Sequence, residues 1–425
     1  MSILIFLGTL IILMVLGMPI AFALILTGIA LMVQLNFFDA QLVAQNMLAG
    51  ADIYPLMAVP CFILAGELMN AGGISKRIIN LAVSMVGHIQ GGLGYVAIAA
   101  TLLLGCFSGS ALADTAAVAT LLIPMMRNNG YPVARSAGLI AAGGVIAPIV
   151  PPSMAFIIFG VTTNTSVSAL FIAGIVPALL RAGGLVVVWA LLSRKMQVKL
   201  QPKRSWSERL STIKDASWAL VLPIIIVGGL RGGVFTPTEA SAVAAVYAMF
   251  VGLFVYREVK ISQLMGLLVN AGKTTSTVMF LCAAAFVSSY MVTLADLPAQ
   301  VTDFLGPMIE HPRLLMLAIM LLLLAIGNVM DLTPTILVMG PVLMPLVIKA
   351  GIDQTYFGVM FILVGTLGLI HPPVCTVLNV VCGVAKISLE SATKGVWPFL
   401  LAEAILVFLF VFYPGFITLP MTWFR

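Results

Sequence analysis

Two apolar segments of this chain, residues 101–126 and 322–347, are interrupted by small and polar residues at corresponding places. The first runs through Gly105-Cys-Phe-Ser-Gly-Ser-Ala-Leu-Ala-Asp-Thr115, and the second through Gly327-Asn-Val-Met-Asp-Leu-Thr-Pro-Thr335. A bilayer core holds no water to satisfy free backbone groups, so a broken helix survives there only where it lines a cavity within the protein. A pair of such breaks, one in each half of a chain, is typical of the binding site of a transporter.

The composition excludes a soluble protein. Hydrophobic residues make up 61% of the chain and charged residues 8%, and the mean hydropathy is +1.16. Soluble domains carry about 25% charged residues, and several apolar runs here exceed the roughly 18 residues of a membrane span. The sequence therefore predicts an all-α polytopic membrane protein. The first apolar run, Ile3 to Val33, has no basic leader and no clear cleavage site, so we expect it to be retained.

The positive charge is concentrated near the middle of the chain. The formal net charge is +6. Seven basic residues lie within residues 194–214: Arg194, Lys195, Lys199, Lys203, Arg204, Arg209 and Lys214. Basic loops stay on the cytoplasmic side of a membrane, so we expect a cytoplasmic linker here. Because membrane spans flank this stretch, nucleic-acid binding is not the expected use of its charge.

The two halves on either side of this linker repeat with an offset of 221 residues. The matched positions are mostly proline and glycine: Pro124 and Pro345, Gly144 and Gly365, Pro151 and Pro372, Pro152 and Pro373, Gly174 and Gly395, Pro177 and Pro398. These residue types set backbone shape, so their repetition predicts repeated breaks and turns. Halves of parallel or of inverted topology are both compatible with the pattern, and functional precedent favours inversion.

We therefore divide the chain into a first repeat (1–193), a basic linker (194–214) and a second repeat (215–425). Each repeat is expected to hold plain scaffold spans, an amphipathic stretch (near 76–88 or 258–272), a re-entrant helical hairpin, a broken transmembrane helix and a closing span. The hairpins are expected at about 91–126 and 312–347, and the broken helices at about 131–160 and 352–384. Proline removes a backbone donor and clashes with the preceding turn, so both broken helices should unwind at their Pro-Pro pairs.

The hairpin tips and the proline breaks supply oxygen ligands with little charge. Unwound backbone offers carbonyl groups; Ser108, Ser110, Thr333 and Thr335 offer hydroxyls, and Asn328 offers an amide oxygen. Such ligands suit a hard monovalent cation, while half-helix amino ends suit an anionic substrate. For any single serine or threonine, ordinary helix packing is the competing interpretation.

Charged residues within the apolar segments are the next candidates, because an intramembrane carboxylate is costly and usually functional. Asp331 is expected to support an ion or carry a proton, and Asp114 could instead cap a helix. Glu67, Glu239, Asp296 and Glu403 are expected to cap or snorkel at span ends. Arg127 and Arg135 could pair with a substrate carboxylate, although interfacial anchoring is the favoured role.

Other features point away from enzyme chemistry. The five cysteines show neither metal spacing nor a disulfide framework and suit helix packing. Gly272-Lys-Thr274 lacks the spacing of a phosphate-binding loop. Ser108-Gly109 resembles a membrane serine nucleophile, but none of the three histidines, His88, His311 and His371, has a convincing base-like position. His371 lies in a proline break, where it could titrate or contribute only its carbonyl.

At these residues the chain resembles a known family, the large membrane (M, DctM-like) subunit of tripartite ATP-independent periplasmic (TRAP) transporters. The resemblance covers essentially the whole chain and favours the sugar-acid branch. Its carriers are Ser108-Gly-Ser-Ala-Leu-Ala-Asp-Thr-Ala-Ala117, Ile149-Val-Pro-Pro-Ser153, Phe235-Thr-Pro-Thr-Glu-Ala240, Met330-Asp-Leu-Thr-Pro-Thr335 and Asn379-Val-Val-Cys-Gly-Val384.

The resemblance implies an elevator-type secondary transporter of the bacterial inner membrane, like other ion transporters with paired hairpins. A scaffold would hold still while a domain containing both hairpins slides with an organic anion, driven by sodium. It also implies two partners besides membrane lipid: a small four-helix membrane subunit, expected as a separate chain, and a soluble periplasmic substrate-binding protein. No cofactor is expected, and Na⁺ is the only metal ion.

The resemblance further suggests where sodium binds. One site would combine Ser108 and Ser110 with backbone oxygens of Gly327, Gly368, His371 and Val374. Symmetry suggests a mirror site formed by Cys106, Ala147, Val150, Ser153, Asp331 and Thr333. Candidate substrate contacts are Ser108, Asn328, Thr335, Arg135 and Asn379. The family often has threonine where this chain has His371, so a contact there is altered.

The expected function is sodium-coupled import of an organic acid anion, a sugar acid such as sialic acid or diketogulonate, delivered by a periplasmic binding protein. One alternative is a binding-protein-independent sodium- or proton-coupled dicarboxylate transporter of similar fold. A passive channel and an intramembrane hydrolase are the more distant alternatives.

Overall fold

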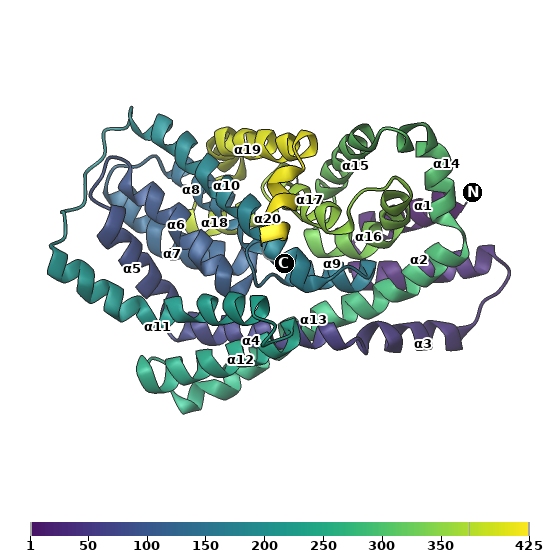
Figure 1. Ribbon diagram of the computed structural model, residues 1–425, viewed down its shortest axis with the longest axis horizontal. Coiled ribbons are helices and arrows are strands. Elements are labelled where there is room, and N and C mark those ends of the chain that lie inside the picture. Colours follow the sequence, from purple (N-terminus) through teal and green to yellow (C-terminus); the bar gives the residue numbers. More distant parts are fainter. Residues whose placement is uncertain (1, 374, 424–425) are drawn as a thin grey trace.

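The computed structural model describes residues 2–373 and 375–423, and the side chains of all of these except 3, 302–307 and 420–423. Every regular element in this part of the chain is helical. Seven of its helices are long and apolar enough to cross a membrane, and a bent pair of helices would make an eighth span. The all-α membrane fold expected from composition is confirmed (Figure 1).

The first half of the chain forms helices up to the basic linker. Their bounds are α1 Ser2–Val15, α2 Ile20–Gln34, α3 Ala40–Ala51, η1 Tyr54–Met57, α4 Ala58–Ala71, α5 Ile74–Val86, α6 Gly92–Ser108, α7 Ala111–Asn128, α8 Val133–Gly144, η2 Ala147–Ile149, α9 Met154–Thr163 and α10 Val167–Ser193. The apolar run from Ile3 to Val33 is two helices instead of one, because Gly17, with φ +80°, and Pro19 separate α1 from α2.

The second half begins within the basic stretch. Its helices are α11 Trp206–Arg231, α12 Pro237–Phe250, η3 Val251–Val255, α13 Ile261–Leu294, α14 Leu297–Ile309, α15 Pro312–Gly327, α16 Leu332–Lys349, α17 Gln354–Gly368, α18 Thr376–Ala385, α19 Leu389–Phe412 and α20 Gly415–Trp423. The amphipathic stretch expected near 258–272 is the start of α13, a continuous helix of 34 residues. It crosses the molecule obliquely in Figure 1.

Helix bounds in the two halves recur at the offset read from the sequence. Helix α7 begins at residue 111 and ends at 128, and α16 begins at 332 and ends at 349, a shift of 221 at both ends. Not every repeated proline breaks a helix, however. Pro124, Pro345, Pro177 and Pro398 all lie inside continuous helices. The expectation that they mark breaks or turns is wrong, because a long helix tolerates an internal proline when neighbouring groups satisfy the freed carbonyl.

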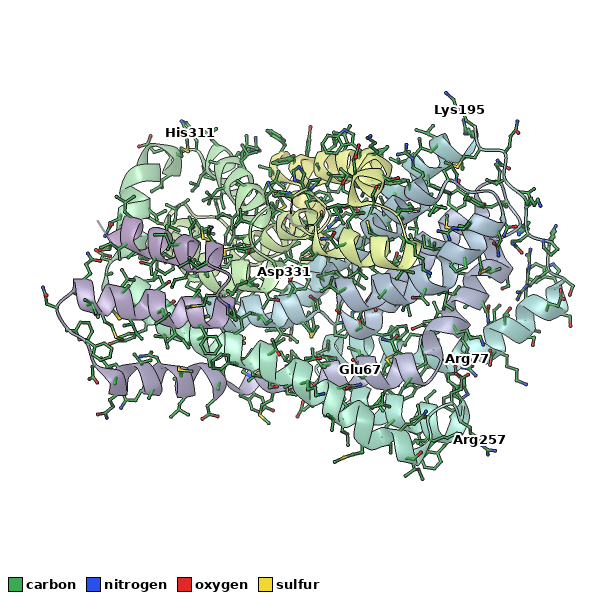
Figure 2. All side chains as sticks on the ribbon, turned by 180° about the vertical axis from the view of Figure 1, so that it is seen from behind. Glu67, Arg77, Lys195, Arg257, His311 and Asp331 are labelled. Carbon is green, nitrogen blue, oxygen red and sulfur yellow. The ribbon has the colours of Figure 1, made fainter. Side chains whose placement is uncertain are left out.

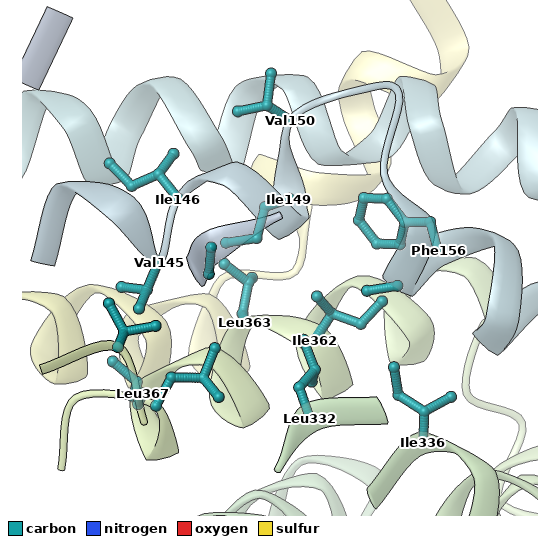
Figure 3. Packing of buried hydrophobic residues seen from close by; sticks show 14 of the residues in the cluster. Val145, Ile146, Ile149, Val150, Phe156, Leu332, Ile336, Ile362, Leu363 and Leu367 are labelled. Atoms are coloured by element: carbon teal, nitrogen blue, oxygen red, sulfur yellow. The ribbon is translucent and has the colours of Figure 1, made fainter. Parts of the chain in front are cut away.

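The broken helices are interrupted at the Pro-Pro pairs. Helix α8 ends at Gly144, and α9 starts at Met154 with an axis bent by 44°. Helix α17 ends at Gly368, and α18 starts at Thr376. Residues on either side of the first break pack with α16 and α17 around Ile149, Leu332 and Leu363, so the two halves share one core (Figure 3).

Short polar side chains fix where the functional helices begin. Ser110 caps α7, Ser153 caps α9 and Ser166 caps α10, and each side chain accepts a bond from a backbone N–H in the first turn. Asp331, Asp353 and Ser388 cap α16, α17 and α19 in the same way. Such caps satisfy backbone donors that a helix end otherwise leaves free. Glu239 forms a capping box with Thr236 at the start of α12, which confirms its expected capping role.

Elements far apart in sequence lie side by side in the core. Helix α7 packs against α18, and α16 packs against α9, so each hairpin contacts a broken helix of the other half. Helix α8 crosses α19 at backbone distance, since a Cβ on Gly138 would lie 2.5 Å from the carbonyl carbon of Gly395. A second group, α2, α3 and α4, packs along α13.

Candidate functional site

The tip of the first hairpin is a tight turn held by serine hydroxyls. Gly109 ends α6 with φ +58°, the left-handed region that favours glycine. The Ser108 hydroxyl donates to Asp114 Oδ1 at 2.7 Å and accepts from the Ser110 backbone N–H at 3.0 Å. Asp114 is buried, and its second oxygen has no partner among the described residues. The tip therefore gathers hydroxyl and carboxylate oxygens at the amino end of α7.

This tip lies directly against the first break. A Cβ on Gly109 would lie 2.7 Å from the Pro152 carbonyl oxygen, and one on Gly105 would lie 2.8 Å from the Ala147 Cα. Within the break, the Ser153 hydroxyl donates to the Pro148 carbonyl and accepts from the Phe156 N–H. Only glycine permits this approach, so the hairpin and the break present their backbone oxygens to one small region.

The second hairpin carries a different set of polar groups. Asp331 caps α16 by accepting from the Leu332 N–H at 3.0 Å, and the Thr335 hydroxyl donates to the Asp331 carbonyl at 2.8 Å. Thr335 is fully buried. The side-chain oxygen of Asn328 is also buried and has no partner among the described residues. Asp331 lies near the centre of the molecule (Figure 2).

Here too the tip meets the break of its own half. A Cβ on Gly368 would lie 2.6 Å from the Gly327 carbonyl oxygen and 2.8 Å from its carbonyl carbon. The ends of α15 and α17 are thus in backbone contact, as Gly105 and Ala147 are in the first half. Each half therefore brings a hairpin tip to an unwound segment.

The expected sodium ligands fall into these two clusters. Cys106, Ser108, Ser110, Ala147, Val150 and Ser153 belong to the first hairpin and break, whereas Gly327, Asp331, Thr333, Gly368 and His371 belong to the second. Val374 lies outside the described residues. The contacts above do not join Ser108 or Ser110 to Gly327 or Gly368, so that combination remains a prediction. His371 Nδ1 lies 2.6 Å from the Pro372 carbonyl oxygen.

The expected substrate contacts are less closely gathered. Ser108, Asn328 and Thr335 lie at the hairpin tips, and Asn379 is an exposed residue of α18. Arg135 is in the first turn of α8, twelve residues before Ala147, which is roughly 18 Å along a helix. It donates to the Gly395 carbonyl at 2.9 Å. This geometry favours a role for Arg135 away from the breaks.

Arg127 also contacts backbone. It donates to the carbonyl of Ala385, the last residue of α18, at 2.5 Å. A cation at a helix carboxyl end satisfies a free carbonyl and complements the helix dipole. Arg127 thus joins the end of the first hairpin to the end of the second broken helix.

Arg181 was missed in the sequence and Glu403 was assigned to the wrong place, although the two belong to one buried cluster. Glu403 is expected at a span end, but it is fully buried in the middle of α19, where it pairs with Arg181 of α10. Arg181 is fully buried too, and it also donates to the Thr366 hydroxyl of α17 at 2.8 Å. Both are ionisable residues near the centre of apolar spans, which is the signal that could have found them.

Two cavities lie near the carboxyl end of α9. A cavity of about 280 Å³ lies between α9, α13 and α16 and is lined in part by Thr162, Asn164 and Ser289. One of about 680 Å³ opens nearby, between the start of α10 and Tyr54 and Thr236. The hairpin-tip residues do not line either of them.

Comparison with known proteins identifies the family. The model of the tripartite ATP-independent periplasmic transporter DctM component matches residues 7–416. The chain belongs to this family. It is 52% identical, over 100% of both chains, to the 2,3-diketo-L-gulonate TRAP transporter large permease protein YiaN of Escherichia coli strain K12. It is 39% identical, over 94% of both chains, to the sialic acid TRAP transporter large permease protein SiaM of Vibrio cholerae.

A solved structure has a related fold. The YdaH transporter of Alcanivorax borkumensis matches with a TM-score of 0.59 at 13% identity, over 88% of each chain. As a TRAP large permease, the chain is a multi-pass protein of the bacterial inner membrane and a transporter component instead of an enzyme. Large permeases of this family work with a small membrane subunit and a periplasmic binding protein. The resemblance read from the sequence is confirmed.

Proposed function

We propose that this permease imports a sugar-acid anion together with sodium, and that it receives the anion from a periplasmic binding protein. The observation that carries the proposal is the backbone contact between hairpin tip and break in each half, Gly109 with Pro152 and Gly327 with Gly368. Carbonyl and hydroxyl oxygens at such junctions suit Na⁺, and the amino ends of α7 and α16 suit a carboxylate.

The names of the relatives support a sugar acid as the substrate. Proteins named for 2,3-diketo-L-gulonate and sialic acid transport are 52% and 39% identical to this chain. Two named for C4-dicarboxylates, from Pseudomonas aeruginosa and Rhodobacter capsulatus, are 37% and 33% identical. The order of identity favours a sugar acid over a dicarboxylate. A dicarboxylate remains the second candidate.

The packing supports an elevator motion. Both hairpins and both broken helices pack on one another through the α7–α18, α16–α9, α7–α8 and α16–α17 contacts, whereas α2, α3 and α4 pack along α13. The first group would slide, carrying anion and sodium, and the second would form the fixed scaffold. Gly66 of α4 lies at the boundary, since a Cβ there would be 3.4 Å from the Ser108 Cβ.

The test is uptake into vesicles that hold the permease and its small subunit. Radiolabelled diketogulonate or sialic acid should enter only with the binding protein outside and an inward sodium gradient. Uptake that persists when potassium replaces sodium would refute sodium coupling. Uptake without the binding protein would favour the binding-protein-independent alternative. Succinate entering in preference to either sugar acid would identify a dicarboxylate carrier.

A further inference from the structure

A basic pocket lies where α8, α10 and α19 meet, at one edge of the molecule. Its volume is about 630 Å³, and its polar lining comprises Arg135, Lys195, Ser391 and Lys394. Arg135 begins α8, Lys195 follows the end of α10, and Ser391 and Lys394 lie in the first turns of α19. Figure 2 shows Lys195 at the periphery. Three cations from separate elements thus converge on one cavity.

The floor of this pocket is rigid. A Cβ on Gly395 would lie 1.9 Å from the Ala134 carbonyl oxygen, so α8 and α19 touch through their backbones. The Arg135 guanidinium donates to the Gly395 carbonyl, which fixes its plane at the bottom of the cavity. An arginine side chain has five N–H donors, and this bond is the one that Arg135 makes among the described residues. The Arg135 guanidinium is therefore held in place, and its other N–H groups remain able to donate to a bound anion.

The two lysines are exposed, and the nearby negative charge is weakly held. Glu390 accepts from Lys394 at 2.7 Å, but the two side chains are 78% and 76% exposed. An exposed pair at this spacing contributes little, and Lys394 can exchange it for another anion. Arg135, Lys195 and Lys394 thus contribute three positive charges, against the one negative charge of Glu390. The pocket therefore favours a ligand with one or two negative charges.

The other wall of the pocket is apolar. Leu191, Leu192 and Met196 line it at the end of α10, a membrane span, and the Leu191 side chain is 59% exposed. Lys195 belongs to the basic linker that the positive-inside rule places in the cytoplasm. A soluble anion would gain nothing from the leucines, whereas a phospholipid would place its phosphate on the cations and its acyl chains along α10. Basic pockets between membrane helices on this side suit anionic lipid headgroups.

We propose that the pocket between α8, α10 and α19 binds the phosphate headgroup of an anionic phospholipid from the cytoplasmic leaflet, with Arg135, Lys195 and Lys394 as its ligands. The site lies roughly 18 Å along α8 from the first break. It is separate from the proposed transport site, and its test does not depend on transport.

The experiment measures the lipid retained by the purified protein in native mass spectrometry, after equilibration with phosphatidylglycerol and phosphatidylethanolamine in equal amounts. The pocket variant is Lys195→Gln with Lys394→Gln. The control is Lys203→Gln with Lys214→Gln, which removes the same charge from exposed positions in the linker. We expect the pocket variant to retain at least about tenfold less phosphatidylglycerol, since each lysine near an anionic surface contributes severalfold in affinity. The control should match the parent protein.

Two results would overturn the proposal. Equal retention of phosphatidylglycerol by the pocket variant and the control would show that the lipid binds elsewhere. Displacement of the lipid by millimolar inorganic phosphate would assign the pocket to a soluble phosphate anion. A thermal melting temperature equal to that of the parent protein confirms that each variant is folded. These surface lysines make no other side-chain bond in the described residues than that of Lys394 with Glu390.

Discussion

Arg181 of α10 and Glu403 of α19 form an ion pair with both side chains fully buried, and the same guanidinium donates to Thr366 of α17. Thr366 lies two residues before Gly368, where α17 gives way to the second break. The ion pair thus links α10 and α19, the closing spans of the two halves, to α17, whose end contacts the second hairpin. We expect it to fix the position of that helix end.

Removing one member of this pair should destabilise the protein strongly. Arg181→Met or Glu403→Leu would leave a buried charge unpaired, which costs about 3–5 kcal/mol. The double variant should recover much of this loss, because well-packed apolar residues can replace a buried pair. Thermal unfolding of the purified protein measures both. Lys394→Gln is the matched control, since its exposed pair with Glu390 contributes about 0.5 kcal/mol or less.

Gly109→Ala should abolish uptake. At φ +58° an alanine costs about 1–2 kcal/mol, and its Cβ would lie 2.7 Å from the Pro152 carbonyl oxygen and push the hairpin away from the break. Gly351→Ala is the matched control, because Gly351 has φ +69° but nothing within 4 Å of a Cβ. The measurement is the rate of uptake into vesicles that hold each variant. If both variants lose transport equally, backbone strain and not the hairpin contact is responsible.

Gly368→Ala should weaken sodium binding, so that uptake needs a higher sodium concentration to reach half its maximal rate. A Cβ there would lie 2.6 Å from the Gly327 carbonyl oxygen and separate α15 from α17. Gly383→Ala in α18, where nothing lies within 4 Å, should leave transport intact and stabilise its helix by about 0.5–1 kcal/mol. The measurement is uptake at varied sodium concentration. An unchanged half-saturating concentration in the Gly368 variant would contradict a sodium site at this junction.

Ser108→Ala should lower uptake more than Ser108→Thr. The alanine variant leaves the buried Asp114 Oδ1 and the Ser110 N–H without the bonds that the hydroxyl makes at 2.7 and 3.0 Å. A buried polar group left unpaired costs about 1–3 kcal/mol. Threonine keeps the hydroxyl. Equal activity of the two variants would show that the hydroxyl is dispensable. A circular dichroism melt separates loss of fold from loss of transport.

The sequence predicted well those features that backbone chemistry determines locally. The Pro-Pro pairs mark the interruptions after Gly144 and Gly368, and the small and polar residues within the two apolar segments mark the gaps between α6 and α7 and between α15 and α16. Proline and glycine act on their own segment, so their effect can be read without knowing the neighbours. The prolines at 177 and 398 mislead because packing against other helices decides whether a helix continues through them.

What the sequence could not supply were partners distant along the chain. Glu403 looks like a span-end residue until α10 brings Arg181 beside it. The bond of Arg135 to the Gly395 carbonyl likewise depends on α19. Similarly, residues 273–311 gave no clear expectation, and they complete α13 and form α14. Which residues of the two hairpins lie close to one another depends on how the halves pack, and no local pattern encodes that.

The length of α13 carries a mechanical consequence. Its 34 residues span roughly 51 Å, while the hydrocarbon layer is about 30 Å thick. A straight helix cannot shorten, so this one must incline or emerge from the bilayer. Since it packs against α16 as well as α2, α3 and α4, lipids of shorter or longer acyl chains would change its inclination. Membrane thickness would therefore affect the position of α13, against which α16 of the second hairpin packs.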